Sequence, residues 1–340
     1  MKTSDFYYEL PKELIAQYPS TQRDASALMV IHRITGLTEH KHFYDIVDYL
    51  QPGDCLVFND SKVIRARLLG KKQTGAKIEI LLIKQIEKKH WQALIKPLKR
   101  LKENDIITIE QDFSVKLLQK EAQGTCLVEL MGTSDSLAQI ERYGKIPLPP
   151  YIEDDESKYD RYQTIYAKTP GSVAAPTAGL HFSEELLAKI KEKNVSQAFL
   201  TLHVGIDTFR PVKEDRVENH KMHTEYYHIS QENADLINET KSHGKRIIPV
   251  GTTAMRTLEG CMQKYGRIKA VADSTDIYIY PPYEFKIADA LITNFHLPQS
   301  TLLMLVSAFY DREKLLAAYR QAIEHQYRFF SFGDAMFLHS

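Results

Sequence analysis

The spacing of hydrophobic residues changes along the chain, and the first 61 residues mix strand and helix patterns. The mostly apolar residues 28–32 and the residues 37–42 flank a turn at Gly36, which predicts a β-hairpin. Residues 43–50 have the spacing of a short helix that ends at a Pro-Gly pair. The apolar run at residues 54–58 then predicts a buried strand.

A second pattern begins at residue 62. Short runs rich in β-branched and aromatic residues follow one another, with turn residues between most of them. Short strands with little helical periodicity between them are typical of a small antiparallel barrel. A proline-rich segment at residues 146–150 marks the exit from it. The six predicted strands lie at residues 64–69, 76–83, 91–95, 105–109, 113–118 and 125–130.

Helical and strand patterns alternate in the rest of the chain. Ser183 can cap a helix whose first turn holds Glu184 and Glu185, and Ser230 can cap another that stops at Gly244. We expect strands at 197–203 and 246–250, and further helices at 253–265, 301–310 and 313–325. The sequence therefore predicts an α/β protein. Its main domain, residues 1–61 plus 151–340, has a mixed sheet and carries an inserted six-stranded antiparallel β-barrel, residues 62–150.

The composition is that of an ordinary globular protein. Of 340 residues, 43% are hydrophobic and 26% are charged, with 44 basic side chains against 44 acidic ones. Three cysteines far apart predict neither a disulfide framework nor a zinc site. The N-terminus lacks the apolar run of a signal peptide, and the most apolar stretch, residues 302–310, is about half of the ~20 residues that a membrane span needs. We expect a cytoplasmic protein without membrane segments and, as a working hypothesis, a monomer.

Although the formal net charge of the chain is zero, one segment of it is strongly basic. Residues 62–104 contain 13 Lys and Arg against 3 Glu. This surplus is either a solvated face of the barrel or a surface that follows RNA phosphates, because clustered Lys and Arg supply the sequence-independent part of RNA affinity. The second interpretation assigns RNA contacts to Lys96, Lys99, Arg100 and Lys102.

Common cofactor and hydrolase motifs are absent from the sequence: it has no P-loop, no G-x-G-x-x-G and no G-x-S-x-G. Polar residues instead follow several predicted strands, where ligands bind in open α/β sheets. Each alone is most often scaffold, but together they favour one shared cleft, and histidine suits proton transfer near neutral pH. These residues are His181 before the Ser183 helix, His203 after the strand at 197–203, Thr252, Thr253 and Arg256 after Gly251, and Asn294 and His296 after an apolar strand. His220, His223 and Glu225 form only a weak metal-ligand pattern, and we expect no metal.

The same runs, with others, resemble the S-adenosylmethionine:tRNA ribosyltransferase-isomerase family of the queuosine pathway. The resemblance extends from end to end of the chain in the family's order. The run at residues 171–182, which ends Ala-Gly-Leu-His-Phe, is highly specific. The matching motifs lie at residues 8–17, 52–60, 146–152, 161–164, 171–182, 203–205, 208–211, 220–223, 251–253, 293–298 and 327–331.

The resemblance implies an α/β domain with an inserted β-barrel, as the hydrophobic pattern does. It also implies a reaction: the ribosyl moiety of S-adenosylmethionine is transferred to 7-aminomethyl-7-deazaguanine at the wobble position of a tRNA. The sugar isomerises to give epoxyqueuosine, and adenine and methionine are released. S-Adenosylmethionine is then a consumed substrate, the tRNA bearing the modified base is the partner, and no metal or redox cofactor is required.

Within the matching motifs, His181, His203 and His296 are the candidate catalytic groups, and the sequence leaves open which of them is the base. Four positions depart from the family pattern, and they bear on local contacts rather than on the reaction class: Lys62, Asp207, Pro282 and Gln299. The candidate substrate-binding residues are Asn59, Asp60, Arg65, Tyr162, Gln163, Thr177, Gly179, His220, His223, Glu225, Thr252, Thr253, Arg256 and Asn294.

Two other function classes stay open from the residues. A non-catalytic RNA-binding protein would account for the basic barrel but not for the polar strand ends. An ordinary S-adenosylmethionine-dependent tRNA methyltransferase would form S-adenosylhomocysteine, and the glycine-rich first loop typical of such folds is missing. The labelled products of the reaction distinguish all three.

Overall fold

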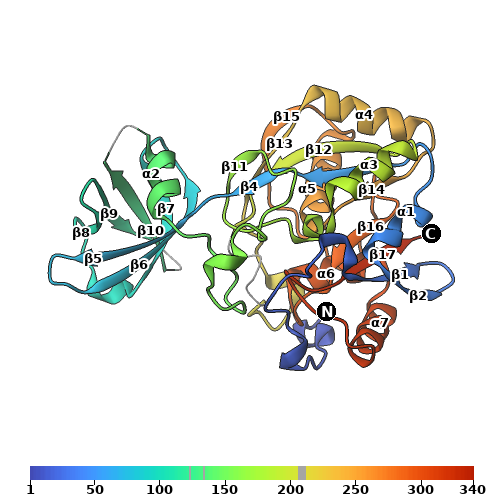
Figure 1. The fold of residues 1–340 in the computed structure, drawn as a ribbon, viewed down its shortest axis with the longest axis horizontal. Helices are drawn as coiled ribbons and strands as arrows, with labels where there is room; N and C mark the ends of the chain where they lie inside the picture. Colours follow the sequence, from blue (N-terminus) through green and yellow to red (C-terminus); the bar gives the residue numbers. More distant parts are fainter. Residues whose placement is uncertain (122–123, 133–134, 206–211) are drawn as a thin grey trace. The chain divides into compact units, whose positions relative to one another are not determined.

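The computed structural model describes residues 1–121, 124–132, 135–205 and 212–340, which form two compact units (Figure 1). The main unit contains Met1–Ser61, Pro149–Thr169 and Ala175–Ser340, and the barrel unit contains Lys62–Leu148 and Pro170–Ala174. The sequence analysis placed residues 170–174 in the main domain. They belong instead with the barrel, because Ile64 N donates to Ser172 O at 3.0 Å and Val173 is buried in the barrel's hydrophobic cluster.

The barrel unit is a closed six-stranded antiparallel barrel, as predicted, with the strand order β10-β7-β6-β5-β8-β9. Alternate residues point inward because side chains alternate across a strand. In β6, for example, Ile78, Ile80 and Leu82 are buried. A helix that the sequence analysis did not predict, α2 (Ser136–Tyr143), is capped by the Asp135 side chain. The strands are β5 (Arg67–Lys72), β6 (Lys77–Gln85), β7 (His90–Lys96), β8 (Ile106–Glu110), β9 (Phe113–Lys120) and β10 (Thr125–Met131).

Two mixed sheets form the main unit, which confirms the predicted α/β class. The first has the order β14-β3-β12-β13-β15, in which β14, β3 and β12 are parallel and the remaining pairs antiparallel. The second has the order β16-β17-β1-β2, with β17 and β1 parallel. Their bounds are β1 (Ala27–His32), β2 (Thr38–His42), β3 (Cys55–Asn59), β12 (Ser196–Leu202), β13 (Glu225–Ile229), β14 (Ile247–Pro249), β15 (Val271–Thr275), β16 (Leu291–Asn294) and β17 (Ala335–His339). Short strands β4 (Ser61–Val63) and β11 (Thr169–Ser172) pair where the chain passes between the units.

Side-chain caps fix where most of the long helices begin. Ser183, Ser230 and Ser300 each accept a hydrogen bond from a backbone N–H in the first turn of α3, α4 and α6, and Asp311 does so for α7. In the described part of the chain, no helix is long and apolar enough to cross a membrane. The helices are α1 (Ile46–Tyr49), α3 (Glu184–Glu192), α4 (Gln231–Ser242), α5 (Thr252–Tyr265), α6 (Thr301–Phe309) and α7 (Arg312–Glu324). The 3-10 helices include η3 (Arg23–Ala25), η5 (Leu98–Arg100) and η8 (Thr177–His181).

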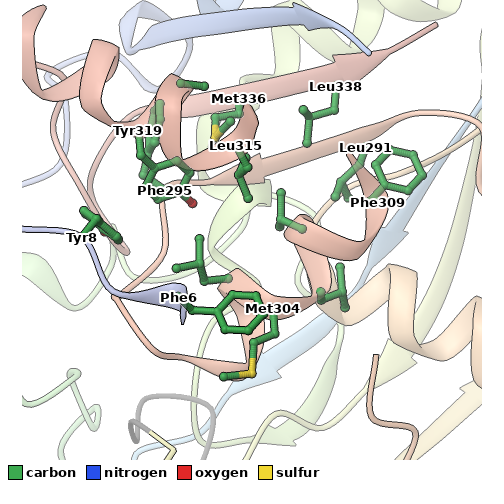
Figure 2. Packing of buried hydrophobic residues seen from close by; sticks show 14 of the residues in the cluster. Phe6, Tyr8, Leu291, Phe295, Met304, Phe309, Leu315, Tyr319, Met336 and Leu338 are labelled. Carbon is green, nitrogen blue, oxygen red and sulfur yellow. The ribbon is translucent and has the colours of Figure 1, made fainter. Parts of the chain in front are cut away.

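The β1 strand is buried on both faces, and its alternating side chains enter two separate hydrophobic clusters. Met29 and Ile31 join the cluster that packs beneath α6 and α7, whereas Leu28 and Val30 join the cluster that includes β3 and α3. Figure 2 shows the first cluster, in which the rings of Phe295 and Tyr319 lie 5.2 Å apart and nearly edge to face. Burial on both faces explains why the sequence of this strand is a nearly continuous run of apolar residues.

The carboxyl ends of several strands meet at one edge of the main unit. The strands β14, β3 and β12 run parallel, so their last residues lie at the same edge. A parallel bridge between Val250 and Ile292 brings the end of β16 there as well. Gly251 makes the turn from β14 into α5 with a φ of 91°, and its N–H donates to Ile292 O at 2.7 Å. Glycine suits this turn because side chains disfavour positive φ.

Candidate active site

His181 is held at the end of η8, a turn that requires its glycine. Gly179 is buried, and a Cβ atom at this position would overlap the Tyr166 hydroxyl and lie 2.8 Å from Thr164 Cγ2. The small residue therefore lets η8 pack closely against the segment that holds Thr164 and Tyr166. The His181 ring stacks on Phe43, with 5.0 Å between the ring centroids.

Both ring nitrogens of His181 are hydrogen-bonded. Nδ1 lies 2.7 Å from Ser26 Oγ, and Nε2 lies 3.0 Å from Asn294 Nδ2. An amide nitrogen can only donate, so Nε2 is the accepting nitrogen and Nδ1 carries the proton. Burial, helped by the charges of Arg328 and Arg23, lowers the pKa of His181 to about 3. The ring is therefore neutral at physiological pH.

Asn294, the last residue of β16, and His296, two residues later, line a small pocket. Asn294 also donates to Phe330 O, while its Oδ1 is buried and accepts no hydrogen bond from the described residues. His296 Nε2 lies 2.8 Å from Thr293 Oγ1, and burial lowers the pKa of His296 to about 3. The other polar residues of the pocket are Tyr151, Thr177, Ser300 and Ser331, and the Tyr151 and Ser331 hydroxyls are hydrogen-bonded to each other at 2.7 Å.

A buried ion pair lies behind the first turn of α5. Arg256 donates to the Glu225 carboxylate and to Ile277 O, and Glu225 also faces His223 Nε2 at 3.1 Å. Burial by itself would raise the pKa of Glu225, but the charges of Arg256 and His223 hold it at about 2. Arg256 Nη2 and Thr253 Oγ1 are buried without a hydrogen-bond partner among the described residues. Thr252 is buried at the same helix start.

The ends of β3 and β12 place Asn59, Asp60 and His203 together. Asn59 is fully buried and holds the two strand ends to each other, because it exchanges hydrogen bonds with both backbone groups of Leu202. Asp60 accepts from Thr201 Oγ1 at 2.6 Å. Burial lowers the pKa of His203, and the charge of Asp60 opposes this shift. Nδ1 of His203 is buried and lacks a partner in the described part of the chain.

The structure places other predicted residues apart from this edge or gives them local contacts. Tyr162 is buried, with its ring edge-on to Phe332 at 5.7 Å, and the backbone oxygen of Gln163 accepts from Arg23 Nη2. His220 pairs with Glu214 at 3.0 Å. In the barrel unit, Arg65 lies 3.5 Å from Glu141. The candidate RNA contacts lie at the end of β7, in η5 and just after it, and all four are exposed: Lys96, Lys99, Arg100 and Lys102.

Three of the four departures lie where the structure can be described, and the first of them, Lys62, is an exposed residue of β4. The Gln299 backbone has a positive φ of 58° and its O accepts from Val212 N, and Pro282 follows a cis peptide bond. Asp207 and the motif at residues 208–211 lie outside the described residues. In the described part of the chain, no group of three or more His, Cys, Asp or Glu side chains is arranged to hold a metal ion.

Sequence reasoning missed several polar residues that complete this edge. Ser26 fixes the proton on His181, and Tyr151 and Ser331 supply the hydroxyls of the pocket. Arg23 donates to Leu180 O at 3.1 Å and so ties η3 to η8. Tyr151 and Ser331 lie inside motifs of the family resemblance, and their place in those motifs could have identified them as candidate site residues. Ser26 and Arg23 lie outside those motifs, so nothing in the sequence marked them.

Comparisons with known proteins agree with one another over the whole chain. The family model described as "Queuosine biosynthesis protein" matches residues 3–338. A curated protein of Sulfurihydrogenibium sp. (strain YO3AOP1), named S-adenosylmethionine:tRNA ribosyltransferase-isomerase, is 53% identical over 341 residues, which cover 99% of this chain and 100% of that protein.

A solved structure gives the same result. The crystal structure of S-adenosylmethionine tRNA ribosyltransferase from Thermotoga maritima is 42% identical, with a TM-score of 0.58, and the match covers 98% of this chain and all of that one. The sequence, the fold and these matches place the chain in the queuosine biosynthesis protein family, and it is an S-adenosylmethionine:tRNA ribosyltransferase-isomerase.

Proposed function

We propose that this enzyme transfers the ribosyl moiety of S-adenosylmethionine to 7-aminomethyl-7-deazaguanine at the wobble position of a tRNA. It then isomerises the sugar to the epoxycyclopentanediol of epoxyqueuosine, and adenine and methionine leave. Membership of the family supports the reaction type. The identity of the acceptor base and of the products is the finer part of the proposal. We also propose that the protein acts as a monomer in the cytoplasm.

The chemistry needs a base, an acid and exclusion of water. The sulfonium of S-adenosylmethionine acidifies the C5′ protons, so a positioned base can remove one and leave a stabilised ylide. Collapse of the ylide expels adenine, which has to be protonated. The aminomethyl group of the base then attacks the activated sugar, and methionine leaves as the epoxide closes. These steps use proton transfers and substitution, so S-adenosylmethionine is a consumed substrate and we propose that no metal or redox cofactor takes part.

The observation that carries the proposal is the set of polar groups at one sheet edge. Asn294 and His296 line a pocket with the hydroxyls of Tyr151 and Ser331, next to the neutral His181. Polar groups in fixed positions orient a small-molecule ligand and give its site specificity. We propose that it receives part of S-adenosylmethionine, and that His181 orients the Asn294 amide towards it.

Of the three candidate histidines, we propose His203 as the general base. His181 Nε2 already accepts a hydrogen bond, and both His181 and His296 have pKa values near 3, which makes them weak proton acceptors. Burial lowers the pKa of His203 as well, but the Asp60 carboxylate opposes this shift, and His203 Nδ1 accepts no hydrogen bond from the described residues. A nearby carboxylate stabilises the imidazolium that forms when the base takes a proton.

The barrel is the proposed contact with the body of the tRNA. Lys96, Lys99, Arg100 and Lys102 are exposed on one end of the barrel, at β7 and η5. Asp105, three residues after Lys102, is already paired with Lys72 at 2.7 Å. Exposed basic side chains of this kind release counterions when they contact phosphates, which makes binding salt-dependent.

Labelled S-adenosylmethionine tests the reaction directly. Label in the ribose is expected on the tRNA after reaction, while label in the methyl group leaves with methionine, because the S–CH₃ bond stays intact. A tRNA carrying unmodified guanine should bind but not turn over, because it has no exocyclic aminomethyl nucleophile. Methyl label on the tRNA would identify a methyltransferase instead, and the absence of any label would leave a binding protein.

A further inference from the structure

A second, small pocket is lined in part by the His181 ring. Two arginines line it with three hydroxyl groups and the His181 ring, and Ser331 lines both this pocket and that of His296. The two pockets are therefore neighbours. The polar residues of the second pocket are Ser20, Arg23, Ser26, Arg161, His181 and Ser331.

The two arginines carry charge that no carboxylate neutralises in the described part of the chain. Arg23 donates to Leu180 O at 3.1 Å and to Gln163 O at 2.9 Å. Arg161 donates to Thr21 O at 3.2 Å and to Ser20 O at 2.8 Å. These acceptors are neutral carbonyls, and they occupy two of the five N–H donors of each guanidinium. The Arg161 Nε donor is buried and has no partner among the described residues.

The surroundings add to the positive potential. Arg328 lies close enough to act on His181, and it pairs with the Asp334 carboxylate at 3.2 Å. Burial, and then the like charge of Arg161, lower the pKa of Arg23, so the two guanidinium groups are near each other. The Asp24 carboxylate of the same segment accepts from Ser183 Oγ at 2.6 Å, in the cap of α3. Among the described residues, Asp334 pairs with Arg328, and no carboxylate forms an ion pair with Arg23 or Arg161.

We propose that Arg23 and Arg161 form a binding site for one backbone phosphodiester of the substrate RNA, next to the nucleotide that reacts. This inference rests on the proposed function. A base presented to the neighbouring pocket is joined through its ribose to two phosphodiesters, so the RNA backbone has to pass within one nucleotide of that pocket. Planar guanidinium groups bind phosphate through paired N–H donors, and such contacts fix the register of the RNA.

The carboxylate of S-adenosylmethionine is the other anion in the reaction, and this pocket suits it less. That carboxylate is part of an amino acid with an ammonium group, and the same molecule carries a sulfonium. Three guanidinium groups would repel both cations. A phosphodiester brings one negative charge and no cation, so it matches the unbalanced positive charge of Arg23 and Arg161.

Substitutions of Arg161 separate this role from a purely structural one. Arg161→Gln removes the charge, and Arg161→Lys keeps it while losing the planar fork. We expect Arg161→Gln to weaken tRNA binding by about tenfold at low salt, as for a hydrogen bond to a charged group. The log–log dependence of affinity on salt should flatten by about 0.7–0.9, the value for one phosphate contact. Arg161→Lys should keep most of the salt dependence, and the KM for S-adenosylmethionine should stay unchanged in both variants.

The control is Arg320→Gln, which removes the same charge from an exposed position in α7. Equal losses of affinity in Arg161→Gln and Arg161→Lys with an unchanged salt dependence would mean that the arginine only anchors the backbone, and would overturn the proposal. A raised KM for S-adenosylmethionine with normal tRNA binding would assign the site to the carboxylate and also overturn it. Transfer of ribose label by the wild-type enzyme is measured in parallel, so a failure of the proposed function is seen separately.

Discussion

At the scale of single residues, burial and hydrogen bonding decide what the three histidines can do. His181 and His296 are buried and neutral, and the partners of their rings are Ser26, Asn294 and Thr293. His203 keeps a ring nitrogen without a partner among the described residues. The sequence placed all three at element ends but could not rank them, because the tautomer and the pKa of an imidazole depend on neighbours from distant parts of the chain.

The first residue-scale prediction concerns stability in acid. The pKa values of His181 and His296 are about 3 in the folded protein against 6.5 for an unperturbed imidazole. Between these values the unfolded chain binds more protons than the folded one, so stability is full above about pH 6.5 and falls as the pH falls towards 3. Each histidine contributes up to about 1.4 kcal/mol per pH unit. Denaturant unfolding at pH 7, 6 and 5 should show this slope, and His181→Asn should reduce it by about one proton. An identical slope in the variant would contradict the pKa assignment.

The second residue-scale prediction tests the general base. His203→Ala should lower kcat by about 10²–10⁴-fold, the usual contribution of a positioned acid or base. The unfolding midpoint and tRNA affinity should change little, because the side chain is only partly buried and its Nδ1 has no hydrogen-bond partner to lose among the described residues. His228→Ala is the matched control, since His228 is an exposed histidine on β13, the strand that pairs with β12. Full activity of His203→Ala would show that His203 is not the general base, and His296 would be the next candidate to test.

At the scale of elements, close packing of η8 against neighbouring segments builds the site. Glycine at position 179 allows this approach, and Gly251 allows the turn from β14 into α5 beside Ala178. In the sequence, both segments are recognisable as turns that contain glycine and other small residues. It did not indicate that they meet, because the contact depends on the parallel pairing of β14, β3 and β12 and on the bridge to β16.

The element-scale prediction is that Gly179→Ala destabilises the main unit. The added methyl group would overlap the Tyr166 hydroxyl, and overpacking of this kind costs roughly 1–3 kcal/mol. The thermal unfolding midpoint should fall, and activity should fall with it because His181 moves. The double variant Gly179→Ala/Tyr166→Phe removes the overlapping oxygen and should recover part of the loss. If the double variant is no more stable than Gly179→Ala, contact with Tyr166 is not the reason for the glycine.

At the scale of the whole molecule, the chain forms two units: a basic barrel unit and a main unit that contains the candidate site. The surplus of 13 basic over 3 acidic side chains in residues 62–104 belongs to the barrel unit, although the whole protein is neutral. The proposed RNA contacts therefore fall in both units: the basic residues of the barrel unit, and Arg23 and Arg161 in the main unit beside the candidate site. Binding measurements on variants of each unit distinguish the contribution of the barrel unit to RNA affinity from that of the main unit.

The whole-molecule prediction is that Lys99→Ala/Arg100→Ala weakens tRNA binding through the barrel. Each lost phosphate contact should flatten the log–log salt dependence by roughly one unit. The KM for tRNA should rise, whereas the KM for S-adenosylmethionine should not. The control Lys189→Ala/Lys191→Ala removes the same charge from exposed positions of α3. If both double variants bind tRNA with the wild-type affinity and salt slope, the barrel end at η5 is not part of the RNA interface.

The sequence by itself determined the family and many of the elements, although it did not indicate α2, β13, β15 or β17. Alternation in the barrel strands, serine caps before α3 and α4, and glycine at the turn before α5 are local signals, and local chemistry is enough to read them. Motifs spread along the chain were enough to indicate the reaction class. Only the tertiary structure decided which polar groups share a pocket. Ser26, Arg23 and Arg161 come from segments far from β16 in the sequence, and they reach His181 and Ser331 because the folded strands and 3-10 turns bring those backbones together. Charge balance and protonation depend on that proximity, so no local pattern could have revealed them.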